Sequence, residues 1–431
     1  MGKQFGILGG GIAGLGLSYF LGEDSEVLEK DPTCGGLCRS YQHEGFTFDM
    51  GGHIIFSKDT EILDFELELL KGKVDRHFRQ VSVWFKNRLV KYPFENGLDA
   101  LDPQDRFDCL YNFLENPQRP QHNFEDWIYN TFGKGLADLY LIPYNTKIWK
   151  TPPSEMGTHW VERVPKPPVA DIVKSALGIE TEGYVHQLYF YYPKAGGFQV
   201  LPDTIEALVN GRIVKNFEIK RIEREKTGWM VSNGADERRY KSIVCAMPIF
   251  DFIRALTLTP PEVQRAVDAL QTNSLIVVLV GLKKKQPKLK GLGIYFPQED
   301  LIFHRITCLD YFGDNYVPPG CSSIQAEITA RQSSALWAMR DDDITREVLD
   351  GLDREGLIDK HDVITTTVRR TKYAYPIYDL NREKNLDIIH SFCKGKGIEL
   401  CGRFAEFVYY NSDGILRSSK TVAARMLETA K

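Results

Sequence analysis

The chain has 431 residues, of which 43% are hydrophobic and 26% are charged, and its formal net charge is −4 at pH 7. This length suits two or three lobes rather than one simple core, and the mild negative charge argues against nucleic acid or an anionic membrane as a partner. No apolar run approaches the roughly 20 residues that span a bilayer, and the first residues lack the pattern of a signal peptide. We therefore expect a cytoplasmic protein with no transmembrane segment.

Residues 3–31 are predicted to form a strand, a glycine-rich turn, a helix and a second strand. The turn reads GGGIAG, in which Gly9, Gly11 and Gly14 have the G-x-G-x-x-G spacing of a dinucleotide-binding unit. Gly9 permits the tight turn, Gly11 lets the backbone approach a pyrophosphate, and Gly14 lets the helix pack on the strand. The helix N-terminus directs N–H groups and a positive dipole end toward the phosphates.

An acidic residue and a second glycine pair follow this unit. Glu29 stands twenty residues after Gly9, where a carboxylate accepts hydrogen bonds from the adenosine ribose. The next residues, KDPTCGGLCR up to Arg39, resemble the EK/ER…GGxxR extension of the FAD-containing amine-oxidase and protoporphyrinogen-oxidase superfamily. Near the C-terminus, CGRF at 401–404 resembles the last FAD-binding strand–loop–helix of that superfamily. The residues that we expect to hold FAD are Gly9, Gly11, Ile12, Ala13, Gly14, Glu29, Lys30, Gly36, Leu37, Arg39, Gly51, Gly52, Arg403 and Ser412.

The remaining elements are predicted from apolar spacing and turn residues. We expect helices over 59–71, 103–140, 201–209 and 341–356. We expect a strand pair over 80–90, strands within 212–247 and 274–330 with a buried strand over 274–282, and a strand, loop and helix over 399–429. The pattern predicts an α/β fold in which helical and mixed β-sheet substrate domains interrupt a Rossmann-type FAD-binding domain of the GR2 kind. The expected division is FAD domain 1–75, 195–275 and 385–431, helical lid 100–190, and mixed sheet 76–99 and 276–384.

Short motifs spread over nearly the whole chain resemble the UDP-galactopyranose mutase family, in particular its larger eukaryotic-like branch. In chain order they are GGHIIF at 51–56, YPFEN at 92–96, FEDW at 124–127, PYNTKIW at 143–149, WVERV at 160–164, YFP at 295–297 with FHR at 303–305, YP at 375–376, and GRF at 402–404 with YYN at 409–411. Each motif is short, and their common order and spacing make the resemblance specific.

The resemblance implies an isomerase that interconverts the pyranose and furanose forms of a nucleotide sugar such as UDP-galactose, as used for cell-surface glycans. In such enzymes reduced FAD attacks the anomeric carbon through N5 and expels UDP, and a sugar–flavin adduct forms. The sugar ring then opens and recloses before UDP returns. There is no net redox change, so a reductant is needed only to prepare the flavin. NAD(P)H is the expected reductant, although no second dinucleotide motif is visible.

The resemblance also implies roles for individual residues. Arg163 and Arg305 match the two arginines that bind the diphosphate, for which planar guanidinium groups are well suited. His53 matches the histidine beside the flavin. The residues that match the substrate pocket are Tyr92, Phe94, Glu95, Asn145, Trp149, Tyr295, Tyr375, Tyr409 and Asn411.

Two departures from the family pattern leave the substrate open. Glu95 stands where the family has a glutamine beside the uracil, and an ionised carboxylate only accepts hydrogen bonds, which suits a donor-rich edge such as that of guanine. Gly293 stands where the family often has a tryptophan. The smaller residue is expected to widen the sugar pocket. Galactose, N-acetylgalactosamine, a deoxysugar and an arabinose all stay open.

Two other functions are compatible with the glycine motifs. An oxidoreductase of the amine-oxidase type would act on an amine, a porphyrinogen or a carotenoid. Such an enzyme would have no need of the residues that match the diphosphate site. A non-catalytic flavin-binding protein would have lost those residues. The eight cysteines lack zinc-finger spacing, so we expect no metal site. The sequence does not define the oligomeric state, and a homo-oligomer is compatible with it.

Overall fold

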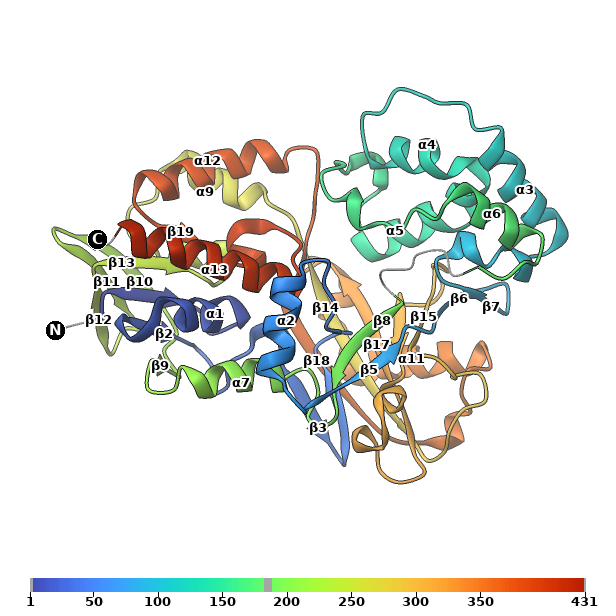
Figure 1. Cartoon of the computed structure of the whole chain (residues 1–431), viewed down its shortest axis with the longest axis horizontal. Coiled ribbons are helices and arrows are strands. Elements are labelled where there is room, and N and C mark those ends of the chain that lie inside the picture. Colours follow the sequence, from blue (N-terminus) through green and yellow to red (C-terminus); the bar gives the residue numbers. More distant parts are fainter. Residues whose placement is uncertain (1–2, 182–187, 430–431) are drawn as a thin grey trace.

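A computed structural model describes residues 3–181 and 188–429 of the chain. Figure 1 shows three groups of elements: a sheet with helices on the left, a large sheet in the lower centre, and a cluster of helices at the upper right. The N- and C-terminal ends both lie in the left-hand group.

The left-hand group is built on a parallel sheet of five strands in the order β19-β13-β1-β2-β9. The strands are β1 (Phe5–Leu8), β2 (Ser25–Leu28), β9 (Ile213–Val214), β13 (Ser242–Cys245) and β19 (Glu399–Leu400). All four residues of β1 are buried, as expected for a central strand that is covered on both faces. The predicted unit at 3–31 is therefore present, and its sheet is completed by strands from distant parts of the chain.

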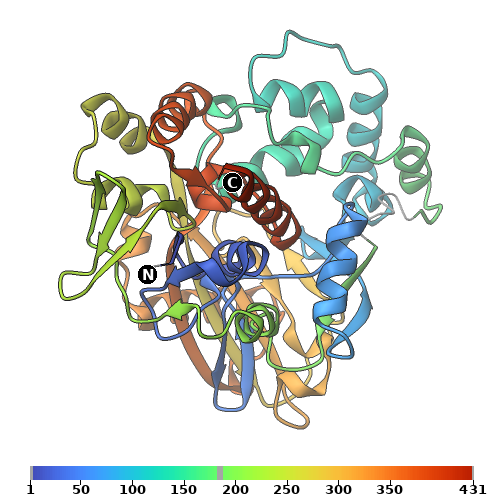
Figure 2. The ribbon, with the colours of Figure 1, turned by 60° about the vertical axis from the view of Figure 1, so that its left-hand side comes forward.

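Two long helices lie side by side on this sheet (Figure 2). They are α1 (Ile12–Leu21) and α13 (Ser412–Thr429). A side chain at Gly16 of α1 would come within 3.1 Å of Leu416 and Ser419, so the two helices approach closely because this position has no side chain. The last helix of the chain thus begins close to the glycine turn.

The large sheet has seven strands in the order β18-β14-β17-β16-β15-β6-β7. They are β6 (Val81–Phe85), β7 (Arg88–Lys91), β14 (Thr272–Leu282), β15 (Gly293–Tyr295), β16 (Arg305–Thr307), β17 (Ser322–Ala330) and β18 (Val363–Pro376). Every residue of β14 after Thr272 is buried, as its apolar run predicted. The smaller sheets consist of β3 (Ser40–His43) with β4 (Phe46–Asp49), β5 (Val74–Phe78) with β8 (Tyr189–Pro193), and β10 (Arg221–Glu225), β11 (Gly228–Ser232) and β12 (Glu237–Tyr240).

The helical cluster includes most of the segment 103–140, which was predicted to be helical. It contains α3 (Pro103–Leu114) and α4 (Phe124–Leu136), separated by a loop that includes Pro117 and Pro120. Proline cannot continue a helix because it lacks an N–H and its ring clashes with the preceding turn. The cluster also contains α5 (Ile142–Trp149) and α6 (Val169–Ala176).

The remaining helices cover the two main sheets. Three of them agree with the predicted ranges: α2 (Thr60–Leu69), α7 (Val200–Leu208) and α11 (Asp341–Arg354). The others, which we did not predict, are α8 (Ile249–Ala255), α9 (Pro261–Ala269), α10 (Ala335–Ala338) and α12 (Arg382–Gly395). Among the described helices, none combines the length and apolar character of a membrane span.

Helix α5 is attached to the large sheet by two buried side chains. Lys147 donates to the carbonyls of Phe296 and Gln298 at 2.9 and 2.6 Å, and Asn273 donates to the carbonyls of Ile148 and Trp149 at 2.9 and 2.8 Å. Burial, with a smaller contribution from Lys150, lowers the pKa of Lys147 to about 7. These bonds fix the helical cluster to the strands that carry the site described below.

The division of the chain into three domains stays a prediction. The five parallel strands lie within the ranges expected for the FAD domain, and the expected boundary at 275–276 falls within β14. Residues 1–2, 182–187 and 430–431 of those ranges lie outside the described residues.

Two glycines of the turn differ in the space available for a side chain, and this difference can be tested. A Cβ at Gly14 would lie 1.8 Å from the carbonyl oxygen of Gly9, whereas a Cβ at Gly11 would meet nothing within 4 Å. We expect Gly14→Ala to lower the free energy of unfolding of the apoprotein by about 3 kcal/mol or more through overpacking, and Gly11→Ala to leave it within about 1 kcal/mol. Urea unfolding of both variants measures this. Equal stabilities would contradict the close packing of α1 on β1.

Candidate functional site

The turn between β1 and α1 forms a cradle that is lined by backbone. The space above Gly11 is open, and no side chain caps the N-terminus of α1, so its first N–H groups are available to an anion. The second glycine loop lies against this turn, because Gly35 N–H donates to the Gly10 carbonyl at 2.9 Å. A Cβ on Gly36 would lie 3.4 Å from the Cα of Gly11. The cradle fits the pyrophosphate of a dinucleotide.

Glu29 and Arg39 flank the cradle. The carboxylate of Glu29 accepts from Gly10 N–H at 2.8 Å and from Asp31 N–H at 2.9 Å, which orients it at the end of β2. Arg39 donates to Asp31 at 2.5 Å, and its buried Nε has no hydrogen-bond partner among the described residues. A buried donor of this kind needs an acceptor, and a cofactor phosphate would supply one. Lys30 is exposed.

The C-terminal loop completes this region. A Cβ on Gly402 would lie 2.7 Å from the Cβ of Ala13 in the first turn of α1. Arg403 donates through Nε to the Tyr410 carbonyl at 2.8 Å. Ser412, the first residue of α13, is buried. The glycine turn, the second glycine loop and the C-terminal loop are therefore adjacent, and these three segments fit FAD.

A glycine loop after β4 carries His53. Its Nδ1 donates to the Gly51 carbonyl at 2.9 Å, which leaves Nε2 as an acceptor. Burial lowers the pKa of His53 to about 3, and the nearby cations of Arg403 and Arg305 contribute to that shift. The imidazole is therefore neutral at physiological pH.

Arg305 is held by a buried carboxylate on the neighbouring strand. Arg305 of β16 and Glu327 of β17 are register partners, and the guanidinium donates to both carboxylate oxygens, at 2.9 and 2.5 Å. Glu327 is fully buried, and it also accepts from the N–H of Gly52 at 3.0 Å. Burial alone would lower the pKa of Arg305, but Glu327 more than offsets it and holds that pKa well above its usual value.

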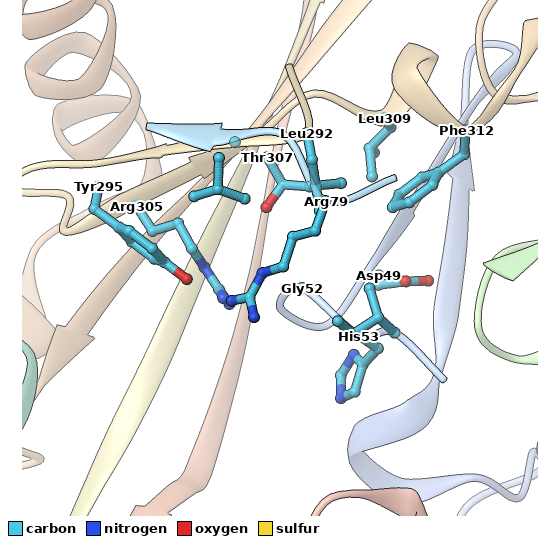
Figure 3. Close-up of a pocket in the computed structure, with 13 residues that line it drawn as sticks. Asp49, Gly52, His53, Arg79, Leu292, Tyr295, Arg305, Thr307, Leu309 and Phe312 are labelled. Carbon is cyan, nitrogen blue, oxygen red and sulfur yellow. The ribbon is translucent and has the colours of Figure 1, made fainter. Parts of the chain in front are cut away.

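A second arginine lies beside the first. Figure 3 shows the guanidinium groups of Arg79 and Arg305 close together, with the hydroxyl of Tyr295 directed toward them. Burial would raise the pKa of Tyr295, but the two guanidinium groups outweigh burial and lower it. Two cations and a phenol at one point suit a diphosphate, whose several oxygens accept charge-assisted hydrogen bonds.

Two rows of aromatic rings lead to this point. In the first row, Phe94 stacks on Tyr140 with ring centroids 4.7 Å apart, Tyr140 stacks on Tyr144 at 5.4 Å, and Tyr144 contacts Tyr295 at 5.4 Å. Tyr92 contacts Tyr295 from another side at 5.0 Å. Burial raises the pKa of Tyr140 and Tyr144 well above the usual value, so both hydroxyls keep their protons.

The second row links the C-terminal loop to helix α5. Tyr375 and Tyr409 have ring centroids 5.7 Å apart, and Trp149 lies 6.1 Å from Tyr375 and 5.9 Å from Tyr409. The guanidinium of Arg163 lies 4.7 Å above the ring of Tyr409, a favourable cation–π distance. Tyr375 also contributes to the electrostatic environment of Arg305.

Three of the expected substrate residues have more specific surroundings. The amide of Asn145 donates to the Leu141 carbonyl and accepts from the indole N–H of Trp149 at 3.0 Å, so it orients Trp149. The backbone carbonyl of Asn411 accepts from Ile415 at the start of α13. Glu95 is 3% exposed, and burial raises its pKa to about 7.

Four residues of the site were not predicted from the sequence: Arg79, Glu327, Tyr140 and Tyr144. Arg79 immediately precedes the alternating segment that became β6, and Glu327 is the charged residue of β17, a strand in which every residue is buried. A charged residue in such a strand is a signal that it has a buried partner. The partner itself could not be identified without the register.

Comparisons with known proteins agree with this geometry. Residues 7–66 match the NAD(P)-binding Rossmann-like domain family, and residues 173–427, more than half of the chain, match the flavin containing amine oxidoreductase family. The chain belongs to the flavin containing amine oxidoreductase family. This membership confirms the predicted fold class and indicates a flavoprotein enzyme.

Solved structures of flavoenzymes are similar to this family member. A crystal structure of reduced UDP-galactopyranose mutase has 26% identity and a TM-score of 0.90, over 100% of this chain and 96% of that chain. A protein from Exiguobacterium sp. 255-15, provisionally described as a protoporphyrinogen oxidase, has 17% identity and a TM-score of 0.78 over 100% and 99% of the chains. Cyclohexylamine oxidase from Brevibacterium oxydans IH-35A has 15% identity and a TM-score of 0.70 over 100% of both chains. The last two show the fold alone.

The neutral state of His53 is testable. Because burial and the cations of Arg403 and Arg305 lower the pKa of His53 to about 3, we expect no change in its protonation between pH 5 and pH 9. NMR titration of ¹⁵N-histidine-labelled protein, with His53→Gln to assign the resonance, measures this. An inflection of the His53 signal near the usual value of about 6.5 would contradict the described environment.

Proposed function

We propose that the protein is an FAD-dependent mutase that interconverts the pyranose and furanose forms of a nucleotide sugar of the UDP-galactose kind. The observation that carries this proposal is the pairing of Arg79 and Arg305 around the hydroxyl of Tyr295, close to the glycine loop that bears His53. The likeness to a reduced UDP-galactopyranose mutase over the whole chain supports it. The motifs favour the eukaryotic-like branch of that family.

In this proposal the arginines hold the leaving group. Arg305 and Arg79 bind the diphosphate and stabilise the negative charge that develops as its bond to the anomeric carbon breaks. The hydroxyl of Tyr295 is directed toward both cations and donates without adding charge. Arg163, above Tyr409, contributes a third cation, and the aromatic rows from Phe94 and Trp149 form the walls of the nucleoside site. NDP-sugar specificity would then depend on these walls.

FAD, when bound in its reduced form at the glycine cradle, supplies the nucleophile for the anomeric carbon. Among the residues that line the cavity, the carboxylate of Asp49 already accepts hydrogen bonds from Ser40, Tyr192 and Phe198, so we assign the role of nucleophile to the flavin. His53 stays neutral and offers Nε2 as an acceptor, so it adds no cation that would draw the diphosphate away from Arg305. We propose NAD(P)H as the physiological reductant.

An oxidoreductase of the amine-oxidase type is the second candidate, and the family match favours it. The cavity argues against a protonated amine as substrate, since Arg79 and Arg305 would repel a cation brought beside them.

The direct test is anaerobic incubation of dithionite-reduced protein with UDP-galactopyranose and UDP-galactofuranose, followed by chromatography. We expect interconversion by the reduced protein and none by the oxidised protein. The variant Arg305→Lys keeps a charge beside Glu327 but loses the planar fork, so we expect the rate to fall roughly 100-fold while the protein stays yellow. The exposed Arg354→Lys serves as the control and should change nothing. Oxygen-consuming turnover of an amine without any sugar conversion would overturn the proposal.

A second test concerns the nucleotide. Below its pKa of about 7, the carboxyl of Glu95 both donates and accepts, as uracil requires; above it, the carboxylate only accepts. We expect the Kd for UDP to rise by up to roughly tenfold per pH unit from pH 7 to pH 9, and Glu95→Gln to abolish this dependence. Calorimetry with UDP and GDP measures both. A Kd for UDP that does not change with pH in the wild-type protein would remove Glu95 from the base site, and tighter binding of GDP at high pH would assign the carboxylate to a purine.

A further inference from the structure

Helix α3 of the helical cluster is apolar on two faces. On the first face, Cys109 has no exposure to solvent, and Leu110 and Phe113 pack on the core of the cluster. Helix α4 lies against this face so closely that a Cβ on Gly135 would come within 2.5 Å of the Asp108 carbonyl. A surface helix usually has one apolar face toward the core and one polar face toward solvent, so a second apolar face on α3 is unusual.

The second face of α3 consists of Phe107, Tyr111 and Leu114, which we call the α3 stripe. Their side chains are 58%, 53% and 56% exposed. Tyr111 is four residues after Phe107 and three residues before Leu114, so the three side chains lie in one row along the helix. The rings of Phe107 and Tyr111 are stacked, with centroids 5.5 Å apart and planes inclined by 10°. The stripe is therefore an ordered apolar surface.

The neighbouring helix α6 enlarges this surface. It packs against α3, and Figure 1 shows both helices at the right-hand edge of the helical cluster. Val169 at the start of α6, and Leu177 and Ile179 after its end, are also more than half exposed. With side-chain areas of about 150–250 Å² for large residues, the six side chains present about 600 Å² of apolar surface, most of the roughly 800 Å² that each partner buries in a standard interface.

The charged groups of α3 favour a neutral partner. Asp105 accepts from Lys86 at 2.5 Å, Asp108 accepts from Gln104 at 3.0 Å, and Arg106 donates to backbone carbonyls of the turn before the helix. A helix that binds an anionic membrane carries several lysines or arginines beside its apolar face, whereas α3 carries two carboxylates and one guanidinium. An apolar protein surface fits this composition better.

The α3 stripe is arranged about its own midpoint. Phe107 lies one turn before Tyr111 and Leu114 lies one turn after it. If two copies of α3 crossed in antiparallel orientation on a two-fold axis at Tyr111, Phe107 would contact the partner's Leu114 and the two Tyr111 rings would meet. A two-fold contact uses the same surface on both subunits, so the stripe is a suitable partner for a second copy of itself.

We propose that two copies of this chain associate through the α3 stripe to form a two-fold dimer, with Tyr111 on the axis and the exposed residues of α6 beside it. This inference does not depend on the proposed mutase function.

The first test is the molar mass of the FAD-loaded protein at micromolar concentration, measured by analytical ultracentrifugation. We expect a dimer for the wild-type protein. Tyr111→Glu brings two carboxylates together on the axis, so we expect the dissociation constant of the dimer to rise at least roughly 100-fold, because an aromatic anchor is lost from both copies. Leu258→Glu is the control, since Leu258 is 82% exposed and lies outside the patch; it should leave the dimer intact. A monomeric wild-type protein, or a dimer that Tyr111→Glu does not weaken, would overturn the proposal.

A mixture of two variants tests the two-fold axis itself. Tyr111→Lys also places like charges on the axis, so we expect it to be monomeric by itself. Mixing it with Tyr111→Glu places opposite charges on the axis, and we expect native mass spectrometry to detect dimers that contain one chain of each variant. If each variant alone is a folded monomer by circular dichroism and the mixture forms no such dimer, the two copies do not meet at Tyr111.

Discussion

A buried ion pair between Arg305 and Glu327 holds the centre of this site. Glu327 has no exposure to solvent, and its carboxylate binds both the guanidinium of Arg305 and the backbone N–H of Gly52. One acidic group therefore fixes the principal cation and the loop that carries His53. A pair of this kind is sensitive to the loss of either member, since the remaining charge would be buried alone at a cost of about 3–5 kcal/mol.

The other contacts of the site extend this arrangement. Tyr295 connects Arg305 to Arg79 and, through Tyr144 and Tyr140, to the loop of Phe94. Lys147 and Asn273 attach α5 to the sheet, so that the walls contributed by α5 keep their position relative to the cations. Such preorganisation suits a site that must stabilise developing charge on a diphosphate, because the cations need no rearrangement when the bond breaks.

The parts that could be predicted from sequence are those with a local physical cause. The glycine turn, Glu29 and the buried strand β14 follow from spacing and burial within one segment. Arg305 and Tyr295 were identified by resemblance to a family. The partners of these residues were not predicted, because Glu327 and Arg79 reach the site only through strand pairing over long distances in the chain. Arg39 was expected to bind phosphate, and its bond to Asp31 shows that it has a second partner. The segment 103–140 is helical as expected except for the loop between α3 and α4, which contains Pro117 and Pro120 and which apolar periodicity alone did not predict.

In the proposed reaction, the site breaks and remakes the bond between an anomeric carbon and a diphosphate. Positional isotope exchange tests it most directly, using a nucleotide sugar with ¹⁸O in the bridge between the sugar and the β-phosphate. We expect the reduced protein to scramble the label between the bridging and non-bridging oxygens of the β-phosphate and the oxidised protein to leave the label in place. We expect Glu327→Gln to slow the exchange. If the reduced protein converts or tightly binds the sugar nucleotide and the label stays in the bridge, this bond is not broken and the proposed reaction is contradicted.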